Sequence, residues 1–394
     1  MRDKIKKKLN ELRENSLFRV MPEISEGAGK YISVEINKGF GKTEVRKYIN
    51  MASNNYLGLS EIQEIKRASA DAVLELGTTS GASRIVTGNY NLYDELERAT
   101  AEFKQTEASL VFNSGYAANV AVFSALADRN TAVFSDKLNH ASIIDGILLS
   151  GAKHIRYRHN DIDDLAALLE MHKDEKDKII ATDTIFSMDG DVCRLRAIVE
   201  LAEAYGAMTI VDEAHASGIF GRGRGYSHEA GLEKRVDIHM GTFSKAFGSF
   251  GAYVAADRDI IDYLRNKGRS FIYSTSLPPA VVAANLAALK YVEDHHDIGY
   301  RLLDAADDIR RQLQVMGFDT GDSVTQIIPV ILGTNERVLM AKEFLMEKGI
   351  YVGAIRPPTV PVNTARLRMT VRLDVLDETE RILDAFRALK AAGI

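Results

Sequence analysis

The stretch LRAIVELAEAYGAMTIVDEAH, residues 195–215, decides the fold of this chain. Leu195–Tyr205 carries apolar side chains at helical spacing, and the short apolar run Met208–Val211 predicts a buried strand. The strand is followed by the polar residues Asp212 and Glu213. A helix followed directly by an apolar strand is typical of a mostly parallel sheet that helices cover on both faces.

The same alternation extends along much of the chain. We expect further strands at Ser109–Phe112, Thr131–Ser135, Lys178–Thr182, Ile238–Thr242 and Ala252–Ala255. Helical patterns such as Tyr116–Leu126 and Asp161–Met171 lie between most of these runs. The sequence therefore predicts an α/β fold with a mostly parallel central sheet in a large domain.

The pattern changes after about Pro279, where a long helical region begins and extends to about Met316. Beyond it we expect three strands and two helices: strands at Gln326–Leu332, Tyr351–Ile355 and Arg366–Val371, and helices at Arg337–Lys348 and Asp377–Ala392. This region predicts a smaller C-terminal α+β domain.

The N-terminal segment is predicted to form an amphipathic surface helix, because Ile5, Leu9 and Leu12 recur at helical spacing among charged residues. The expected domain division is 1–48 for this helix and an arm, 49–279 for the large domain and 280–394 for the small domain.

Composition narrows the function classes. The chain has 394 residues, a net charge of −5 and one cysteine, Cys193. The acidic balance argues against a general nucleic-acid binder, and one cysteine allows no disulfide within the chain, which fits a reducing compartment. No apolar stretch approaches the length of a membrane span. We therefore expect a cytoplasmic protein with neither a nucleic-acid nor a membrane partner.

Several familiar functional motifs are incomplete or absent in this sequence. Asp212-Glu213-Ala214-His215 spells the DEAH box of helicases, which also needs a phosphate loop of the form GxxxxGK[ST]. Gly41-Lys42-Thr43 supplies the end of such a loop, but Ile36 stands where its first glycine is required. The sequence around Ser114 does not match GxSxG. No HExxH or paired CxxC exists, so no metal site is predicted.

Polar residues gather where the predicted strands end, which is where open α/β sheets bind ligands. Five successive strand ends supply such residues: Ser114-Gly115-Tyr116, Asp136 with His140, Ser187, Asp212 with His215, and Thr242 with Ser244 and Lys245. A partly desolvated lysine such as Lys245 can form a Schiff base with pyridoxal phosphate.

That cofactor also needs a carboxylate at its ring nitrogen and a cradle for its phosphate. Asp212 could supply the carboxylate. The helix opening at Ser114-Gly115-Tyr116 could hold the phosphate with its free N–H groups. Thr242 and Ser244 could add hydroxyl donors, and His140 could stack on the ring.

The runs FSKAFG at 243–248 and VDEAH at 211–215 resemble those of the α-oxoamine synthases, which are pyridoxal-phosphate enzymes of fold type I. Further runs match the family in order: SNNYLG at 53–58, NSGYAAN at 113–119, LNHAS at 138–142, FSMDG at 186–190 and YSTSLPP at 273–279. The resemblance covers most of the chain and implies the pyridoxal-phosphate-dependent transferase fold.

The resemblance also implies roles for single residues. Lys245 would carry the cofactor, Asp212 would pair with its ring nitrogen, His215 would bond its phenolic oxygen and His140 would stack on its ring. Gly115, Tyr116, Ser187 and Thr242 would be further cofactor contacts. Arg368 and Asn54 would hold the amino-acid carboxylate, Thr359 would contact substrate and Arg19 would bind the far end of the acyl chain. Family members are homodimers, in which Thr275 or Ser276 would reach the phosphate of the neighbouring subunit.

Within the family, the runs IRPPTVP at 355–361 and TARLR at 364–368 look most like the members that condense L-alanine with a pimeloyl thioester in biotin biosynthesis. The acyl group would come from CoA or a carrier protein, and CO2 would be lost. Freed Lys245 would take the Cα proton, and His140 could donate a hydrogen bond to the thioester carbonyl. The alternatives are a sibling activity, such as glycine C-acetyltransferase or condensation with another acyl-CoA, and an inactive cofactor-binding scaffold.

Overall fold

The computed structural model describes residues 1–27, 29–37 and 43–394, so Gly41 and Lys42 of the rejected phosphate loop lie outside the described residues. These residues form two compact units. The large unit comprises residues 59–187 and 191–301, and the small unit comprises residues 1–58, 188–190 and 302–394. The small unit thus contains both ends of the chain, whereas the three-part division expected from the sequence stays a prediction.

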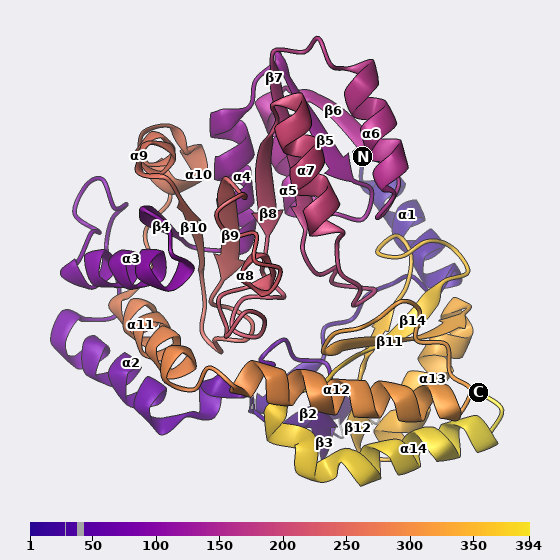
Figure 1. Ribbon diagram of the computed structural model, residues 1–394. Coiled ribbons are helices and arrows are strands. Elements are labelled where there is room, and N and C mark those ends of the chain that lie inside the picture. Colours follow the sequence, from indigo (N-terminus) through magenta and orange to yellow (C-terminus); the bar gives the residue numbers. More distant parts are fainter. Residues whose placement is uncertain (28, 38–42) are drawn as a thin grey trace. The chain divides into compact units, whose positions relative to one another are not determined.

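The large unit is built on a sheet whose described strands number seven, in the order β4-β10-β9-β8-β7-β5-β6 (Figure 1). Their bounds are β4 Ala108–Phe112, β5 Thr131–Asp136, β6 Lys153–Tyr157, β7 Asp177–Asp183, β8 Met208–Asp212, β9 Ile238–Thr242 and β10 Ala252–Ala256. β10 runs antiparallel to both β4 and β9, and the other neighbours are parallel. Six strands therefore run in one direction, and their carboxyl ends meet at one edge. The predicted α/β fold class is confirmed.

Helices cover both faces of this sheet because successive side chains of a strand point to opposite sides. In β8, Ile210 packs into one apolar cluster and Val211 into the other. The first cluster includes α4 Gly115–Leu126, α5 Ala141–Ser150, α9 Arg258–Lys267 and α10 Arg269–Ile272; the second includes α6 Ile162–Met171 and α7 Leu195–Tyr205. Burial on both faces explains why the central strands are continuous apolar runs.

The remaining elements of the large unit are mostly helical: η1 Leu59–Glu61, α2 Gln63–Leu76, α3 Asn91–Lys104, α8 Tyr226–Glu229 and α11 Pro279–Asp294. α12, Ile298–Val315, begins in the large unit and continues in the small unit. Together α11 and α12 account for the long helical region that the sequence predicts after Pro279.

The small unit contains two sheets in its described residues, with strand orders β1-β2-β3-β12 and β11-β14-β13. Its strands are β1 Glu23–Glu26, β2 Tyr31–Asn37, β3 Thr43–Asn50, β11 Ile327–Gly333, β12 Ile350–Tyr351, β13 Gly353–Ile355 and β14 Ala365–Thr370. Its other elements are α1 Arg2–Glu14, α13 Asn335–Glu347, η2 Leu373–Glu378 and α14 Thr379–Ala391. The single strand expected at Tyr351–Ile355 is therefore two strands, which pair with different sheets.

Among the residues that the structure describes, none of the helices is both long and apolar enough to span a bilayer.

Candidate active site

A cavity of about 170 Å³ lies at the edge of the large sheet where the parallel strands end. Nine of the residues singled out in the sequence line it: Gly115, Tyr116, His140, Ser187, Asp212, His215, Thr242, Ser244 and Lys245. They come from the start of α4, from the segments after β5 and β7, and from the ends of β8 and β9 with the loops that follow these two strands. The shared direction of these strands brings together residues that are far apart in the sequence.

Lys245 and His215 lie side by side in the wall of this cavity. The Nζ atom of Lys245 lies 2.9 Å from Nε2 of His215. Lys245 is half-buried, and His215 is only 6% exposed. Both side chains line the cavity of about 170 Å³.

Asp212 forms the anionic side. Its Oδ1 accepts a hydrogen bond from the backbone N–H of Ala214, and its Oδ2 accepts one from Nδ2 of Asn119, both at 2.9 Å. Asp183, at the end of β7, is a second buried carboxyl group in the cavity wall. Burial, and then the charge of Asp212, raise the pKa of Asp183 well above its ordinary value. The carboxyl group of Asp183 also accepts the backbone N–H of His140 at 2.7 Å.

Sequence reasoning missed Asn119 and Asp183. Asp183 had a signal, because it directly follows the predicted strand Lys178–Thr182 and so stands at a strand end. Asn119 lies within the family-like run at 113–119, but nothing local shows that its side chain reaches Asp212.

The start of α4 provides a cradle for an anion. Its N-cap residue, Ser114, accepts the N–H of Ala117, and the first N–H groups of a helix have no partner within it. A Cβ atom on Gly115 would lie 2.9 Å from Cγ2 of Thr242, so this position has room only for glycine. Oγ1 of Thr242 is buried and has no hydrogen-bond partner in the described residues. An unsatisfied hydroxyl beside free N–H groups fits a bound phosphate group.

Two further predicted residues meet in the small unit. Arg368 on β14 is 7% exposed, and both its terminal nitrogens donate to Oδ1 of Asn54 at 3.2 Å. Nη2 of Arg368 also lies 3.4 Å from the hydroxyl of Tyr56. Arg368 and Asn54 are thus adjacent, as expected for residues that would bind one carboxylate.

Arg19 and Thr359 also meet in the small unit. Nη2 of Arg19 donates to Oγ1 of Thr359 at 3.0 Å. Both line a cavity of about 310 Å³ that Lys342 and Arg356 also line. Burial, followed by the charge of Arg19, lowers the pKa of Arg356. Such a concentration of positive charge favours an anionic ligand.

Thr275 does not line the cavity around Lys245. It is exposed, and its carbonyl accepts Nδ2 of Asn113 at 2.6 Å. The hydroxyl of its neighbour Ser276 is already bonded to the carbonyls of Ala82 and Gly88, each at 2.9 Å. Of the two candidates for a contact with another subunit, Thr275 is therefore the one on the surface.

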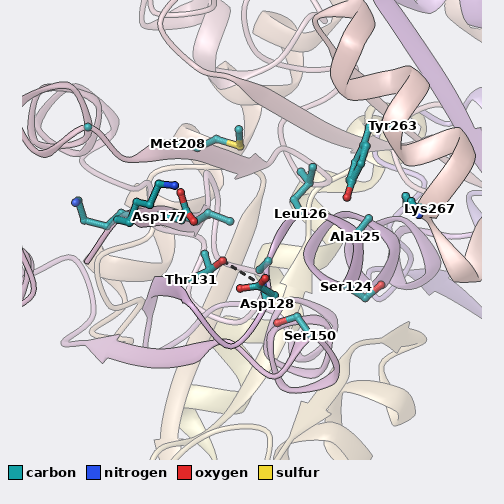
Figure 2. A pocket seen from close by; sticks show the side chains of 15 residues that line it. Ser124, Ala125, Leu126, Asp128, Thr131, Ser150, Asp177, Met208, Tyr263 and Lys267 are labelled. Carbon is teal, nitrogen blue, oxygen red and sulfur yellow. Dashed lines mark hydrogen bonds between the residues drawn. The ribbon is translucent and has the colours of Figure 1, made fainter. Parts of the chain in front are cut away.

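A larger cavity, of about 680 Å³, lies at the opposite edge of the sheet (Figure 2). It is lined by residues at the starts of β5, β7 and β8, including Thr131 and Asp177, and none of the predicted site residues lines it. In Figure 2, the backbone N–H of Asp128 donates to Oγ1 of Thr131. Open α/β sheets bind ligands at the carboxyl ends of their strands, so the smaller cavity is the candidate active site.

The α/β fold and the cavity around Lys245 indicate a pyridoxal-phosphate enzyme, and comparison with known proteins supports this class. Residues 46–386 match the family model described as aminotransferase class I and II, so the chain belongs to that family. The predictions of fold type I and of a pyridoxal-phosphate enzyme are confirmed by this match and by a cofactor-bound structural neighbour.

Three individual proteins show what this chain is similar to within the family. A relative from Bacillus cereus (strain Q1), named “Putative 8-amino-7-oxononanoate synthase”, is 47% identical over 371 residues, which cover 94% of this chain and 92% of the relative. The serine palmitoyltransferase of S. paucimobilis, solved with a PLP–myriocin aldimine, has a TM-score of 0.91 at 29% identity, covering 99% of this chain and 97% of that chain. The 8-amino-7-oxononanoate synthase of Francisella tularensis has a TM-score of 0.75 at 29% identity, and the match covers 88% of this chain and 99% of that chain.

Proposed function

We propose that the protein condenses L-alanine with a pimeloyl thioester and releases 8-amino-7-oxononanoate, CO2 and the free thiol, as a step of biotin biosynthesis. The observation that carries the enzyme class is the meeting of Lys245, Asp212 and Gly115 in one cavity. The substrates are supported by the name of the relative that is 47% identical and by the run IRPPTVP at 355–361.

Pyridoxal phosphate supplies an aldehyde that binds amines and a protonated ring that draws electrons from the substrate. Lys245 would hold the aldehyde, and Asp212 would pair with the ring nitrogen. The start of α4 at Gly115 and Tyr116, with Thr242, would hold the phosphate. His215 would bond the phenolic oxygen, and Ser187 would be a further contact from the segment after β7.

Protein groups then handle the proton and the charge of the reaction. The free amine of Lys245 would take the proton from the Cα atom of alanine and later return one. His140 would pack on the ring and donate a hydrogen bond to the thioester carbonyl oxygen, where negative charge develops.

Two sets of small-unit residues bind the carboxylates of the substrates. Arg368 and Asn54 hold the carboxylate of the amino acid, which Arg368 suits because its planar guanidinium matches a carboxylate. Arg19 and Thr359 bind the acyl substrate, with the far carboxylate of the pimeloyl chain drawn to the positive cavity that Arg356 and Lys342 also line.

A sibling activity is the second candidate, because the serine palmitoyltransferase neighbour has the higher TM-score of the two solved enzymes compared above. The test offers alanine, glycine and serine, each with acetyl-, pimeloyl- and palmitoyl-CoA, and identifies products by mass. We expect turnover with alanine and pimeloyl-CoA. Turnover with glycine and acetyl-CoA alone would instead establish a glycine C-acetyltransferase. Absence of thiol release with every pair, and with pimeloyl-carrier protein as acyl donor, would leave only the inactive scaffold.

We also propose a cytoplasmic homodimer in which Thr275 contacts the phosphate bound by the other subunit. Its exposure supports this assignment over Ser276, whose hydroxyl is bonded within its own chain. Light scattering of the purified protein tests the dimer. Thr275→Ala then tests the contact, since it should weaken cofactor binding without dissociating the subunits.

A further inference from the structure

A chain of hydrogen bonds links Asp212 to His140 through two side chains that have no assigned role. Asn119, which is 1% exposed on α4, donates from Nδ2 to Oδ2 of Asp212 and to Oγ of Ser142, both at 2.9 Å. A carboxylate can only accept hydrogen bonds, so the amide nitrogen of Asn119 faces Asp212. Its second hydrogen then faces Ser142.

The next bond continues the chain to His140. Oγ of Ser142 lies 2.7 Å from Nδ1 of His140. This oxygen accepts a hydrogen from Asn119, and its own hydroxyl hydrogen is available to donate to Nδ1. The backbone N–H of Ser142 also donates to Nδ1, at 3.3 Å. Two donors therefore point at one ring nitrogen.

We propose that Asn119 and Ser142 are positioning residues, which hold His140 as the neutral tautomer that carries its proton on Nε2. A hydrogen on Nδ1 would oppose the backbone N–H of Ser142, which cannot turn away from the helix. Nε2 is thereby left as the donor nitrogen of the ring. The consequence for the reaction rests on the proposed function: the Nε2–H group is the one that would bond the thioester carbonyl oxygen.

The surroundings of His140 as a whole favour a neutral ring. Asp212 and Asp145 favour the protonated ring, whereas Lys245 disfavours it. Although His140 is an exposed residue, the largest effect is desolvation by the surrounding protein, and the net result is a lowered pKa. Asp183 contacts the backbone N–H of His140 rather than its ring.

The test is nitrogen NMR on the pyridoxal-phosphate-loaded protein with isotope-labelled histidine. The signal of His140 is identified among the nine histidines by its loss in His140→Gln. We expect Nδ1 of the wild type to be unprotonated and hydrogen-bonded, and Nε2 to be protonated. A proton on Nδ1, or a doubly protonated ring at neutral pH, would overturn the proposal. This wild-type spectrum is decisive even if a variant fails to fold.

Ser142→Ala removes the hydroxyl and adds no atoms. We expect its Nδ1 resonance to move toward that of a nitrogen without a hydrogen bond, and Ser142→Thr to restore the wild-type position. Ser109→Ala is the matched control, because Ser109 is also buried in the large unit and donates to the carbonyl of Glu97 at 2.7 Å. An unchanged His140 signal in Ser142→Ala would contradict the proposal.

A kinetic measurement distinguishes a failure of this inference from a failure of the proposed substrate assignment. On whichever substrates the panel identifies, we expect Ser142→Ala to lower kcat about tenfold with little change in KM, a smaller loss than removal of a general acid causes. If the protein uses another acyl group, the proposed substrates are wrong but the NMR result still decides the tautomer. An unchanged kcat together with a lost Nδ1 bond would show that the bond has no part in catalysis.

Discussion

Nζ of Lys245 and Nε2 of His215 share one hydrogen bond of 2.9 Å. Two nitrogens can share a bond only if one donates and the other accepts, so an ammonium at Lys245 requires an unprotonated Nε2 at His215. The histidine thus orients the amine that the proposed chemistry needs, and it does so from the segment after the neighbouring strand β8.

Replacing Lys245 should separate folding from chemistry. Lys245→Ala is expected to lose at least about 10⁴-fold in activity, because it removes both the covalent anchor and the base. It should also form no borohydride-stable adduct with pyridoxal phosphate, while its circular dichroism matches the wild type. Lys290→Ala, at an exposed position on α11, is the control and should keep the adduct. An adduct in Lys245→Ala would rule out the assignment.

The unpartnered hydroxyl of Thr242 should be needed only when the cofactor is bound. Thr242→Val keeps the shape of the side chain and removes a buried unsatisfied group, so the apoprotein should be unchanged or more stable by up to about 1 kcal/mol. Cofactor affinity should fall about threefold to tenfold, for one lost hydrogen bond. Thermal unfolding and cofactor titration measure the two effects.

Thr209→Val is the matched control for this experiment. Oγ1 of Thr209 donates to Asp237 at 2.8 Å, so that variant should lose stability and keep its cofactor affinity. Equal cofactor affinities in Thr242→Val and the wild type would remove Thr242 from the site.

Arg368 should govern the affinity for the amino acid. Arg368→Lys removes the planar pair of donors, and we expect kcat/KM for the amino acid to fall about 10-fold to 100-fold, the value of one or two charge-assisted hydrogen bonds. Steady-state kinetics with varied amino acid and saturating acyl thioester measures this loss. Arg387→Lys, on the exposed face of α14, should leave both parameters unchanged. A loss confined to the KM of the thioester would reassign Arg368 to the acyl site.

The buried pair Lys104–Glu213 should control stability. Both side chains are 0% exposed. Burial alone would raise the pKa of Glu213, but the charge of Lys104 and bonds from His239 and Lys104 outweigh it and lower that pKa. Lys104→Met leaves Glu213 as an unpaired buried charge and should cost about 3–5 kcal/mol, measured by chemical unfolding.

The exposed pair Lys173–Glu170 on the surface is the control, and Lys173→Met should cost less than about 1 kcal/mol. Adding Glu213→Gln to Lys104→Met should recover part of the stability, because the unpaired charge is then gone. Equal losses in the buried and the exposed variants would contradict the role of burial.

His159 should make stability depend on pH. Its Nδ1 and Nε2 lie 3.0 Å from Asp136 and 2.8 Å from Asp191. Desolvation opposes the charged ring, but these two carboxylates outweigh it and raise the pKa of His159 from 6.5 to about 10. The folded state therefore binds the proton more tightly than the unfolded chain. The stabilisation is complete below pH 6.5, declines above it and is lost as the pH passes about 10.

His159→Gln isolates this contribution. Its melting temperature should lie furthest below that of the wild type at about pH 6 and should approach it near pH 10. A difference between the two proteins that stays constant from pH 6 to pH 10 would show that charge on His159 contributes nothing.

Much of the candidate site could be predicted because strand ends can be read locally. Lys245, Asp212 and His140 each follow an apolar run, and parallel strands bring their ends to one edge. β6, Lys153–Tyr157, was not predicted, because it lies at the end of the sheet and its mixed burial gives no continuous apolar run. Glu213 was read only as a strand-end residue, whereas its partner Lys104 lies 109 positions earlier in the chain.

The amino-acid sequence by itself determined the order of most strands of the large sheet and the residue types at their ends, because side-chain periodicity and family-like runs are local properties. Only the tertiary structure decided which strands are neighbours, and hence that Asn119 joins Asp212 to Ser142. Such contacts depend on strand pairing and helix packing between segments far apart along the chain, and on where each buried donor finds an acceptor. Local sequence patterns carry no information about these long-range contacts.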